Sequence, residues 1–274
     1  MSLKNNVNVL VEKPVTLIVS QAYKLDKIAK SKGLIIENVF QNRLNPAIQK
    51  LKEAFVKKKF GKIVSCSINL KWRREQSYYN DGWHGTWLMD GGVINQQAIH
   101  HLDVLNWICG PIKRVVATKA NIKNKLEAED TMIVLVDFQN GYAGSIESST
   151  AANDDIEASI SIYGTNGHAK ISGIALNEIE KWSFLKGKDL VHFKKNYSQI
   201  VENGYGLSHI TLVQNLVKNF NKKSKKINLS ITESVKTLKL VHSIYKSVEE
   251  KRWVYIDSKN YSKKLGRDVA KITK

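Results

Sequence analysis

Apolar and polar side chains alternate in six successive segments of the chain between residues 62 and 173. A period of two is typical of β-strands that bury one face, and Asn-Gly turns such as those in QNGY and TNGH join several of the segments. The segments are KIVSCSINLKW, RVVATKANI, TMIVLVDF, YAGSIESSTAA, EASISIYG and HAKISG. The pattern therefore predicts an open, mostly antiparallel sheet.

Helical patterns surround these strands. Residues 93–107 predict a helix between the first two strands, and two more helices are expected near 208–221 and 231–250. Residues 46–61 predict another helix, with Pro46 near its first turn and Gly61 past its end. Helices packed on one face of such a sheet give an α+β fold.

The first residues have a different character. NVNVLVEKP predicts a strand, Leu17 to Lys32 an amphipathic helix closed by Gly33, and LIIENVF a second, buried strand. This is a strand, helix, strand unit typical of parallel sheets. The chain contains no G-x-G-x-x-G turn, so we expect only a remnant of a parallel sheet.

Composition narrows the classes of function. The chain has 274 residues, of which 42% are hydrophobic, and no apolar run reaches the roughly 18 residues of a membrane span. Residues 1–6 lead into a strand rather than a signal peptide, so we expect a cytoplasmic protein that has no membrane partner. Cys66 and Cys109 lie in apolar segments and predict buried thiols, with no disulfide framework and no metal site.

The formal net charge of +18 is compatible with nucleic acid, an anionic surface or a phosphorylated substrate. Many lysines lie in tail-like stretches such as KNFNKKSKKIN and KKLGRDVAKITK, which have no interleaved aromatic residues. This arrangement favours a solvated lysine-rich surface, and we expect no nucleic-acid partner.

The strand VLVEKP ends in Glu12, Lys13 and Pro14. Pro14 disfavours the helical region for Lys13, which places the lysine in an extended conformation where open α/β sheets bind ligands. There its ammonium could donate to a substrate hydroxyl or carbonyl, and burial would lower its pKa. The alternative is a solvated lysine at the end of a strand.

Residues 90–110 read DGGVINQQAIHHLDVLNWICG. Helical spacing places Gln96, His100 and Asp103 along one face. A histidine with a carboxylate one turn later is a plausible general base whose tautomer the carboxylate fixes. The alternative is a histidine satisfied by its own helix, and His101 is expected to be structural.

Residues 71–87 read KWRREQSYYNDGWHGTW, a loop rich in arginine and aromatic residues. Arginine suits phosphate and aromatic side chains suit stacking, so the loop fits recognition of a phosphorylated, ring-bearing ligand. An interface loop in an oligomer is the open alternative.

Taken in order, V-L-V-E-K-P, FQNRLNP, GKIVS, GG and HHLDVLNWICGP resemble the glucose-fructose oxidoreductase, inositol dehydrogenase and MocA family. Within it, WRREQSYYNDGWHGTWLMDGG and EASISIYGTNGHAKISGIALNEIEKW are similar to bacterial UDP-N-acetylglucosaminuronate 3-dehydrogenases, which serve O-antigen (lipopolysaccharide) synthesis. The resemblance extends from about Val7 to about Asp257.

The resemblance implies that residues 1–45 are the remnant of a dinucleotide-binding Rossmann domain. Residues 46–274 would form a substrate-binding and oligomerisation domain, with a homo-oligomer, a dimer or tetramer, made through the open sheet. The implied function is the NAD-dependent oxidation of the 3-hydroxyl of a UDP-N-acetylhexosaminuronate.

By position, the resemblance assigns roles to several residues. Lys13 and His100 would be the catalytic pair, and Glu12 and Arg43 would lie near the NAD cofactor. Gln96 stands where related enzymes usually have Asp or Asn. The candidates for contacts with the UDP-sugar are Arg73, Arg74, Tyr79, Trp83, Thr86 and Gln96.

Since the glycine-rich half is missing, we expect this chain alone to bind NAD weakly and to be inactive. The alternative, from a different class of function, is a non-catalytic sugar-binding or assembly module derived from the same family.

Overall fold

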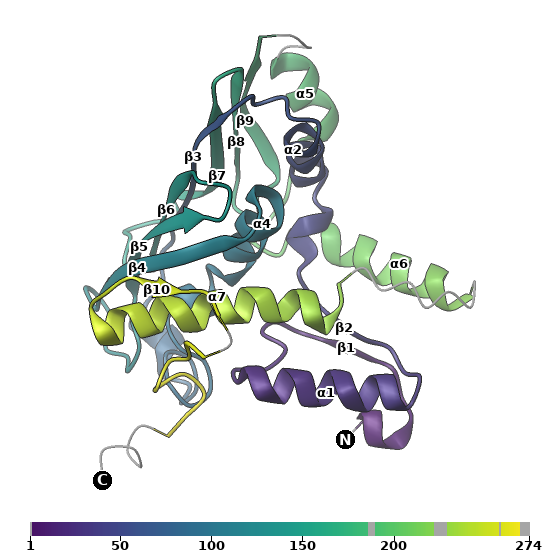
Figure 1. The fold of residues 1–274 in the computed structure, drawn as a ribbon, viewed down its shortest axis with the longest axis vertical. Coiled ribbons are helices and arrows are strands. Elements are labelled where there is room, and N and C mark those ends of the chain that lie inside the picture. The colour runs from purple at the N-terminus through teal and green to yellow at the C-terminus, as the bar shows by residue number, and fades with distance from the viewer. Residues whose placement is uncertain (1, 186–189, 222–228, 258, 269–274) are drawn as a thin grey trace.

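An eight-stranded sheet forms the largest part of the protein. The computed structural model describes residues 2–185, 190–221, 229–257 and 259–268 (Figure 1). The strand order is β10-β4-β5-β6-β3-β7-β8-β9. The strands are β3 (Ile63–Lys71), β4 (Ile112–Ala120), β5 (Thr131–Phe138), β6 (Ala143–Ser149), β7 (Glu157–Gly164), β8 (Gly167–Ser172), β9 (Glu178–Phe184) and β10 (Val254–Tyr255).

The six strands predicted from alternation are all present, and the α+β fold class is confirmed. β4–β5–β6 and β7–β8–β9 are two antiparallel meanders. The central strand β3 joins them, parallel to β6 and antiparallel to β7. A single parallel pairing therefore lies in the middle of a mostly antiparallel sheet.

Helices cover one face of this sheet and enclose the main core (Figure 1). They are α2 (Pro46–Val56), α3 (Val93–Gln96), α4 (Ile99–Cys109), α5 (Leu190–Tyr197) and α7 (Ile231–Glu250). α4 is largely buried, and Leu102, Leu105 and Ile108 have almost no exposed surface. α6 (Ser208–Asn221) projects from the body and contacts Val39 and Leu44 through Leu212 and Leu216 (Figure 1).

The predicted helix over residues 93–107 is wrong in one respect, since it is two helices. α3 ends at Gln96, and α4 begins at Ile99. The predictions for α6 and α7 match the observed bounds, whereas β9 and α5 were not predicted. The lysine-rich stretches continue into residues 222–228 and 269–274, which lie outside the described residues.

The first residues form the expected strand, helix, strand unit. β1 (Val9–Val11) and β2 (Ile36–Asn38) make a separate two-stranded parallel sheet, connected by α1 (Val19–Ser31). α1 and α7 share a second, smaller core. Short 3-10 helices lie at η1 (Ser2–Asn5), η2 (Gln41–Leu44) and η3 (Gln76–Tyr79). Just beyond the carboxyl end of β1, Lys13 contacts Gln96 at the end of α3.

Replacing Leu105 with alanine tests the importance of the α4 contact with the sheet. Leu105 is fully buried, so Leu105→Ala should lower the free energy of unfolding by about 2–5 kcal/mol in urea denaturation. Leu185→Ala is the matched control, because Leu185 is 78% exposed and its loss should change stability by less than about 0.5 kcal/mol. Equal losses for the two variants would contradict this account of the core.

Candidate active site

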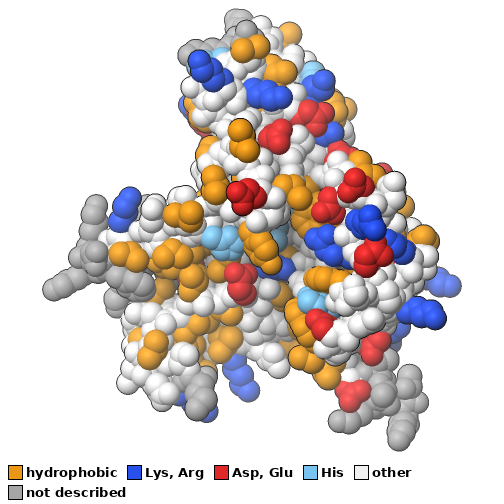
Figure 2. Space-filling view, turned by 180° about the vertical axis from the view of Figure 1, so that it is seen from behind, with side chains coloured by type: hydrophobic (Ala, Val, Ile, Leu, Met, Phe, Trp, Pro, Cys, Tyr) orange, Lys and Arg blue, Asp and Glu red, His pale blue; other side chains and the backbone are white. Residues whose placement is uncertain are grey.

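A cavity of about 930 Å³ lies where the end of β1, the α3–α4 turn and the loop after β3 meet. Figure 2 shows a face of the molecule on which histidine, basic and acidic side chains gather around a central hollow. Six of the predicted site residues line the cavity, namely Glu12, Lys13, Arg74, Trp83, Gln96 and His100. These predicted residues, up to 88 positions apart in the sequence, thus share one cavity.

Lys13 reaches from the end of β1 to the last residue of α3. Its Nζ donates to the Gln96 carbonyl oxygen at 2.5 Å and to Gln96 Oε1 at 2.8 Å. Burial lowers the pKa of Lys13 to about 8, although the carboxylates of Asp90 and Glu12 oppose this shift. A lysine ammonium has three N–H donors, so one remains for a ligand in the cavity.

His100 lies in the first turn of α4 and lines the same cavity as Lys13. Its Nδ1 is buried and has no hydrogen-bond partner within the described ranges, which leaves Nε2 as the ring nitrogen that can meet a ligand. Burial, with the nearby charge of Lys13, lowers the pKa of His100 well below its usual value. The imidazole is therefore neutral near pH 7 and can accept a proton.

The prediction that Asp103 orients His100 is wrong. Asp103 accepts hydrogen bonds from Arg43 Nε at 2.6 Å, Arg43 Nη2 at 2.8 Å and Thr237 Oγ1 at 2.8 Å. A buried carboxylate needs such donors, and a guanidinium supplies two of them in one plane. Arg43, which we expected near the cofactor, instead pairs with Asp103 through two of its N–H groups and does not line the cavity.

Asp90 is a cavity residue that sequence reasoning did not select. Its Oδ2 accepts a hydrogen bond from the backbone N–H of Gly85 at 2.8 Å, yet only 4% of the residue is exposed. Burial raises the pKa of Asp90 to about 7, while the Gly85 N–H and the charge of Lys13 act in the opposite direction. A carboxyl group that titrates near neutral pH in a cavity is a common mark of a functional site.

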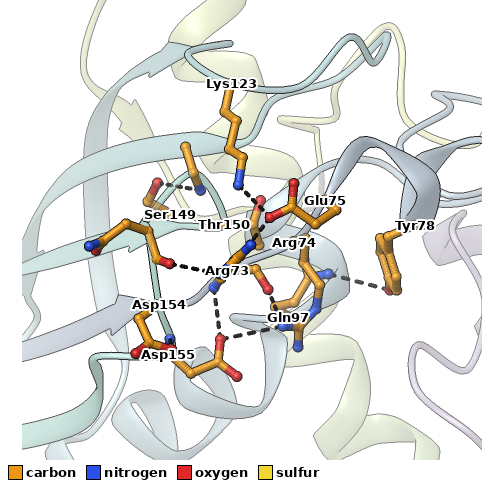
Figure 3. Close-up of polar contacts among 12 residues, drawn as sticks. Arg73, Arg74, Glu75, Tyr78, Gln97, Lys123, Ser149, Thr150, Asp154 and Asp155 are labelled. Carbon is orange, nitrogen blue, oxygen red and sulfur yellow. Dashed lines mark hydrogen bonds and ion pairs between the residues drawn. The ribbon is translucent and has the colours of Figure 1, made fainter.

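Arg74 is the basic residue of the loop after β3 on the cavity wall (Figure 3). Its guanidinium lies 5.2 Å from the Trp72 ring centroid and 5.8 Å from that of Tyr78. Its contact with Asp155 Oδ1 is long, at 3.5 Å, and 28% of its side chain is exposed. Its Nη1 also donates to the Arg73 carbonyl oxygen at 2.5 Å, but the long contact is the guanidinium's only one with a carboxylate within the described residues, so Arg74 can bind an anion.

The structure does not bring Arg73, Tyr79 or Thr86 to the cavity wall. Arg73 pairs with Glu75 at 2.5 Å, as Figure 3 shows, and its side chain is mostly exposed. Tyr79 is buried and its hydroxyl contacts Thr150 Oγ1 at 2.8 Å. Thr86 Oγ1 donates to the Trp83 carbonyl oxygen and so stabilises the loop.

Tyr78 and His84 are further cavity residues that sequence reasoning missed. The hydroxyl of Tyr78 accepts a long hydrogen bond from Gln97 Nε2 at 3.4 Å (Figure 3). Adjacent tyrosines could not be told apart from the sequence. His84 could have been selected from the sequence, because Asp81 precedes it by three residues in a glycine-containing turn and a carboxylate at that spacing can contact the imidazole.

Comparisons of the sequence and of the structure with known proteins lead to the same family. Residues 48–170 match the model of the GFO/IDH/MocA C-terminal domain. The structure is similar to the WlbA dehydrogenase of Chromobacterium violaceum in complex with NADH and UDP-GlcNAcA. The TM-score is 0.85 and the sequence identity is 31%, and the match covers 94% of this chain and 73% of the WlbA chain. The chain belongs to the GFO/IDH/MocA family.

Other GFO/IDH/MocA relatives agree with this placement. The WlbA dehydrogenase of Bordetella pertussis, in complex with NADH and UDP-GlcNAcA, has a TM-score of 0.83 and 27% identity over 92% of this chain and 73% of that chain. The oxidoreductase YteT of Bacillus subtilis is 31% identical over 112 residues, which are 40% of this chain. The chain spans between 26% and 47% of the length of YteT and two further curated relatives.

Two negative findings apply to the described residues of this GFO/IDH/MocA chain. No three His, Cys, Asp or Glu side chains in those ranges come together as metal ligands would. No helix in the same ranges is both long and apolar enough to cross a membrane. Cys66 and Cys109 are buried free thiols, as the sequence predicted.

The unusual titration of Lys13 can be tested through Gln96. Gln96→Asp puts a carboxylate at the atom that Nζ contacts, and this should raise the pKa of Lys13 from about 8 towards the usual value of 10.5. The pH dependence of amine labelling at Lys13, read by mass spectrometry, measures the shift. Gln97→Asp is the control and should shift the pKa less, because Gln97 contacts Tyr78 instead. An unchanged Lys13 titration in Gln96→Asp would disprove the assigned contact.

Proposed function

We propose that this cavity is the sugar site of a nucleotide-sugar dehydrogenase that oxidises the 3-hydroxyl of a UDP-N-acetylhexosaminuronate with NAD. The observation that supports it most is that Lys13, Gln96 and His100 converge on one cavity that also holds Arg74 and several aromatic side chains. Two WlbA dehydrogenases with similar structures bind NADH and UDP-GlcNAcA. Surface-polysaccharide (O-antigen) synthesis in the cytoplasm is the setting that we propose.

Loss of a proton from the sugar hydroxyl is the step that the side chains of this chain can assist. In the proposal, neutral His100 accepts the hydroxyl proton at Nε2. Lys13 gives its third N–H to the oxygen as negative charge develops there. Gln96 accepts the other two N–H groups of Lys13 and so positions the ammonium rather than contacting the sugar itself.

The cofactor fits these residues only in part. NAD would take up the hydride, and the end of β1 with Glu12 and Lys13 is where its nicotinamide would meet the sugar. However, no glycine-rich turn for the pyrophosphate occurs in the sequence, and the Arg43 guanidinium is occupied by Asp103. We expect these 274 residues to bind NAD weakly and to show no turnover alone.

Isothermal titration calorimetry tests the substrate assignment. UDP-GlcNAcA should bind the chain with a dissociation constant on the order of 10 µM. Arg74→Met should weaken this binding about 10-fold because it removes a charge-assisted contact to a phosphate. Arg73→Met is the matched control and should have little effect, since Arg73 pairs with Glu75 outside the cavity. The proposal fails if UDP-GlcNAcA does not bind, or if free myo-inositol binds equally well.

A second candidate function is a sugar-binding module without catalysis, and the pairing of Arg43 with Asp103 away from the cavity favours it. Titrating NAD into the complex with UDP-GlcNAcA separates the two functions. Measurable cofactor binding supports the dehydrogenase, whereas binding of the sugar nucleotide alone supports the module.

We further propose that the uncovered face of the large sheet makes a homo-oligomer, a dimer or tetramer. Ile133 and Leu135 of β5 point away from the helices and are 46% and 52% exposed. Apolar side chains gathered on a sheet face mark an interaction surface.

Light scattering tests this interface. Leu135→Glu should shift the mass towards that of a monomer, because burying an unpaired charge is costly. Leu185→Glu introduces the same charge at another exposed site and should leave the mass unchanged. An oligomer that survives Leu135→Glu would place the interface elsewhere.

A further inference from the structure

The cavity contains a second histidine, and this one has a carboxylate partner. His84 lines the cavity wall in the turn after η3, and only 14% of its side chain is exposed. Its ring centroid lies 3.5 Å from that of Trp83 and 4.0 Å from that of Tyr78. Two aromatic rings therefore hold the imidazole from its sides.

Asp81 fixes the orientation of this imidazole. One carboxylate oxygen accepts the backbone N–H groups of Trp83 at 3.1 Å and His84 at 3.0 Å, and the other contacts His84 Nδ1 at 2.5 Å. The first two bonds anchor the carboxylate, so the third sets the rotation of the ring. Nδ1 is then the donor to Asp81, and Nε2 is left for a ligand. His100 has no such partner for its Nδ1 within the described residues.

Arg74 and His84 both lie against the ring of Tyr78. The Arg74 guanidinium is 5.8 Å from the ring centroid, and the His84 ring is 4.0 Å from it. Arg74 is tied to Asp155 only by a contact of 3.5 Å, so a stronger anion can displace that carboxylate. Of the titratable groups in contact with His84, Tyr78 lies against its ring and Asp81 is already occupied by the turn. The carboxyl groups on the cavity wall are Glu12, Asp90 and Asp155.

We propose that His84, oriented by Asp81, binds the diphosphate of a nucleoside diphosphate ligand together with Arg74. This inference rests on the proposed function and extends it by naming the residue that recognises the phosphate oxygens. A phosphoryl oxygen can accept from Nε2 only when that nitrogen carries a proton, so the ring of the bound form donates from Nδ1 to Asp81 and from Nε2 to the phosphate. Lys13 and His100 then serve the sugar end of the same cavity.

Calorimetry with three probes, UDP, uridine and UDP-GlcNAcA, tests this role. His84→Phe keeps an aromatic ring between Tyr78 and Trp83 but removes Nε2, so it should weaken the binding of UDP about 10-fold. Uridine, which has no phosphate, should bind both proteins with similar affinity. His168→Phe is the matched control, because His168 also stacks on a tyrosine, Tyr163, but does not line the cavity.

Asp81→Asn provides a second, independent variant. It should weaken UDP binding about 3-fold, and in the His84→Phe background it should cause no further loss, because Asp81 acts through His84. Thermal unfolding of each variant shows whether the turn remains folded. If His84→Phe does not fold, the effect of Asp81→Asn on UDP relative to uridine decides the question.

The outcomes separate this inference from the proposed function. Equal binding of UDP by the wild type and His84→Phe overturns the inference, as does an equal loss for uridine and UDP. If UDP binding depends on His84 but UDP-GlcNAcA binds no more tightly than UDP, the diphosphate site stands and the sugar assignment fails. If UDP does not bind the wild type, the diphosphate site is wrong.

Discussion

The buried carboxylate of Asp103 is the constraint on which the arrangement of the site depends. Removing a carboxylate from water is costly unless donors surround it, and here Arg43 and Thr237 provide three hydrogen bonds. These donors come from η2 and α7, so the carboxylate joins two separate parts of the chain to α4. The rotation of α4 about its axis is thereby fixed, and His100, one turn earlier, faces the cavity.

The same burial that creates the cavity also sets its charges. Lys13 and Asp90 would both be fully charged in water, yet burial moves the pKa of one to about 8 and of the other to about 7. Each group exerts a compensating effect on the other because their charges are opposite. Such groups reduce stability at neutral pH, and a protein keeps them where they serve a ligand. On the outer wall, the Arg74 guanidinium and the His84 ring are both partly exposed and so retain contact with solvent.

The strands of the large sheet could be predicted closely because one face of each is buried, so the alternation of side chains records the structure directly. β5 and β7 begin and end where the pattern does. β9 was missed because a register shift places its buried residues Ile179 and Trp182 three positions apart and so breaks the period of two. α5 was missed because it buries only Phe193 and therefore shows little of a helical apolar pattern. The division between α3 and α4 was also missed, since both helices continue the same apolar face.

The sequence by itself determined the fold class, the strand end at Lys13, the helix that carries His100 and the family to which these motifs point. It could not decide which polar groups meet. Asp103 has the right spacing for His100, but a guanidinium that satisfies two lone pairs at once is the better partner for a buried carboxylate. Only the tertiary structure brings in Arg43, 60 residues away, and places Tyr78 rather than Tyr79 on the cavity wall. Spacing along a helix specifies possible neighbours, whereas burial and competing partners select the actual ones.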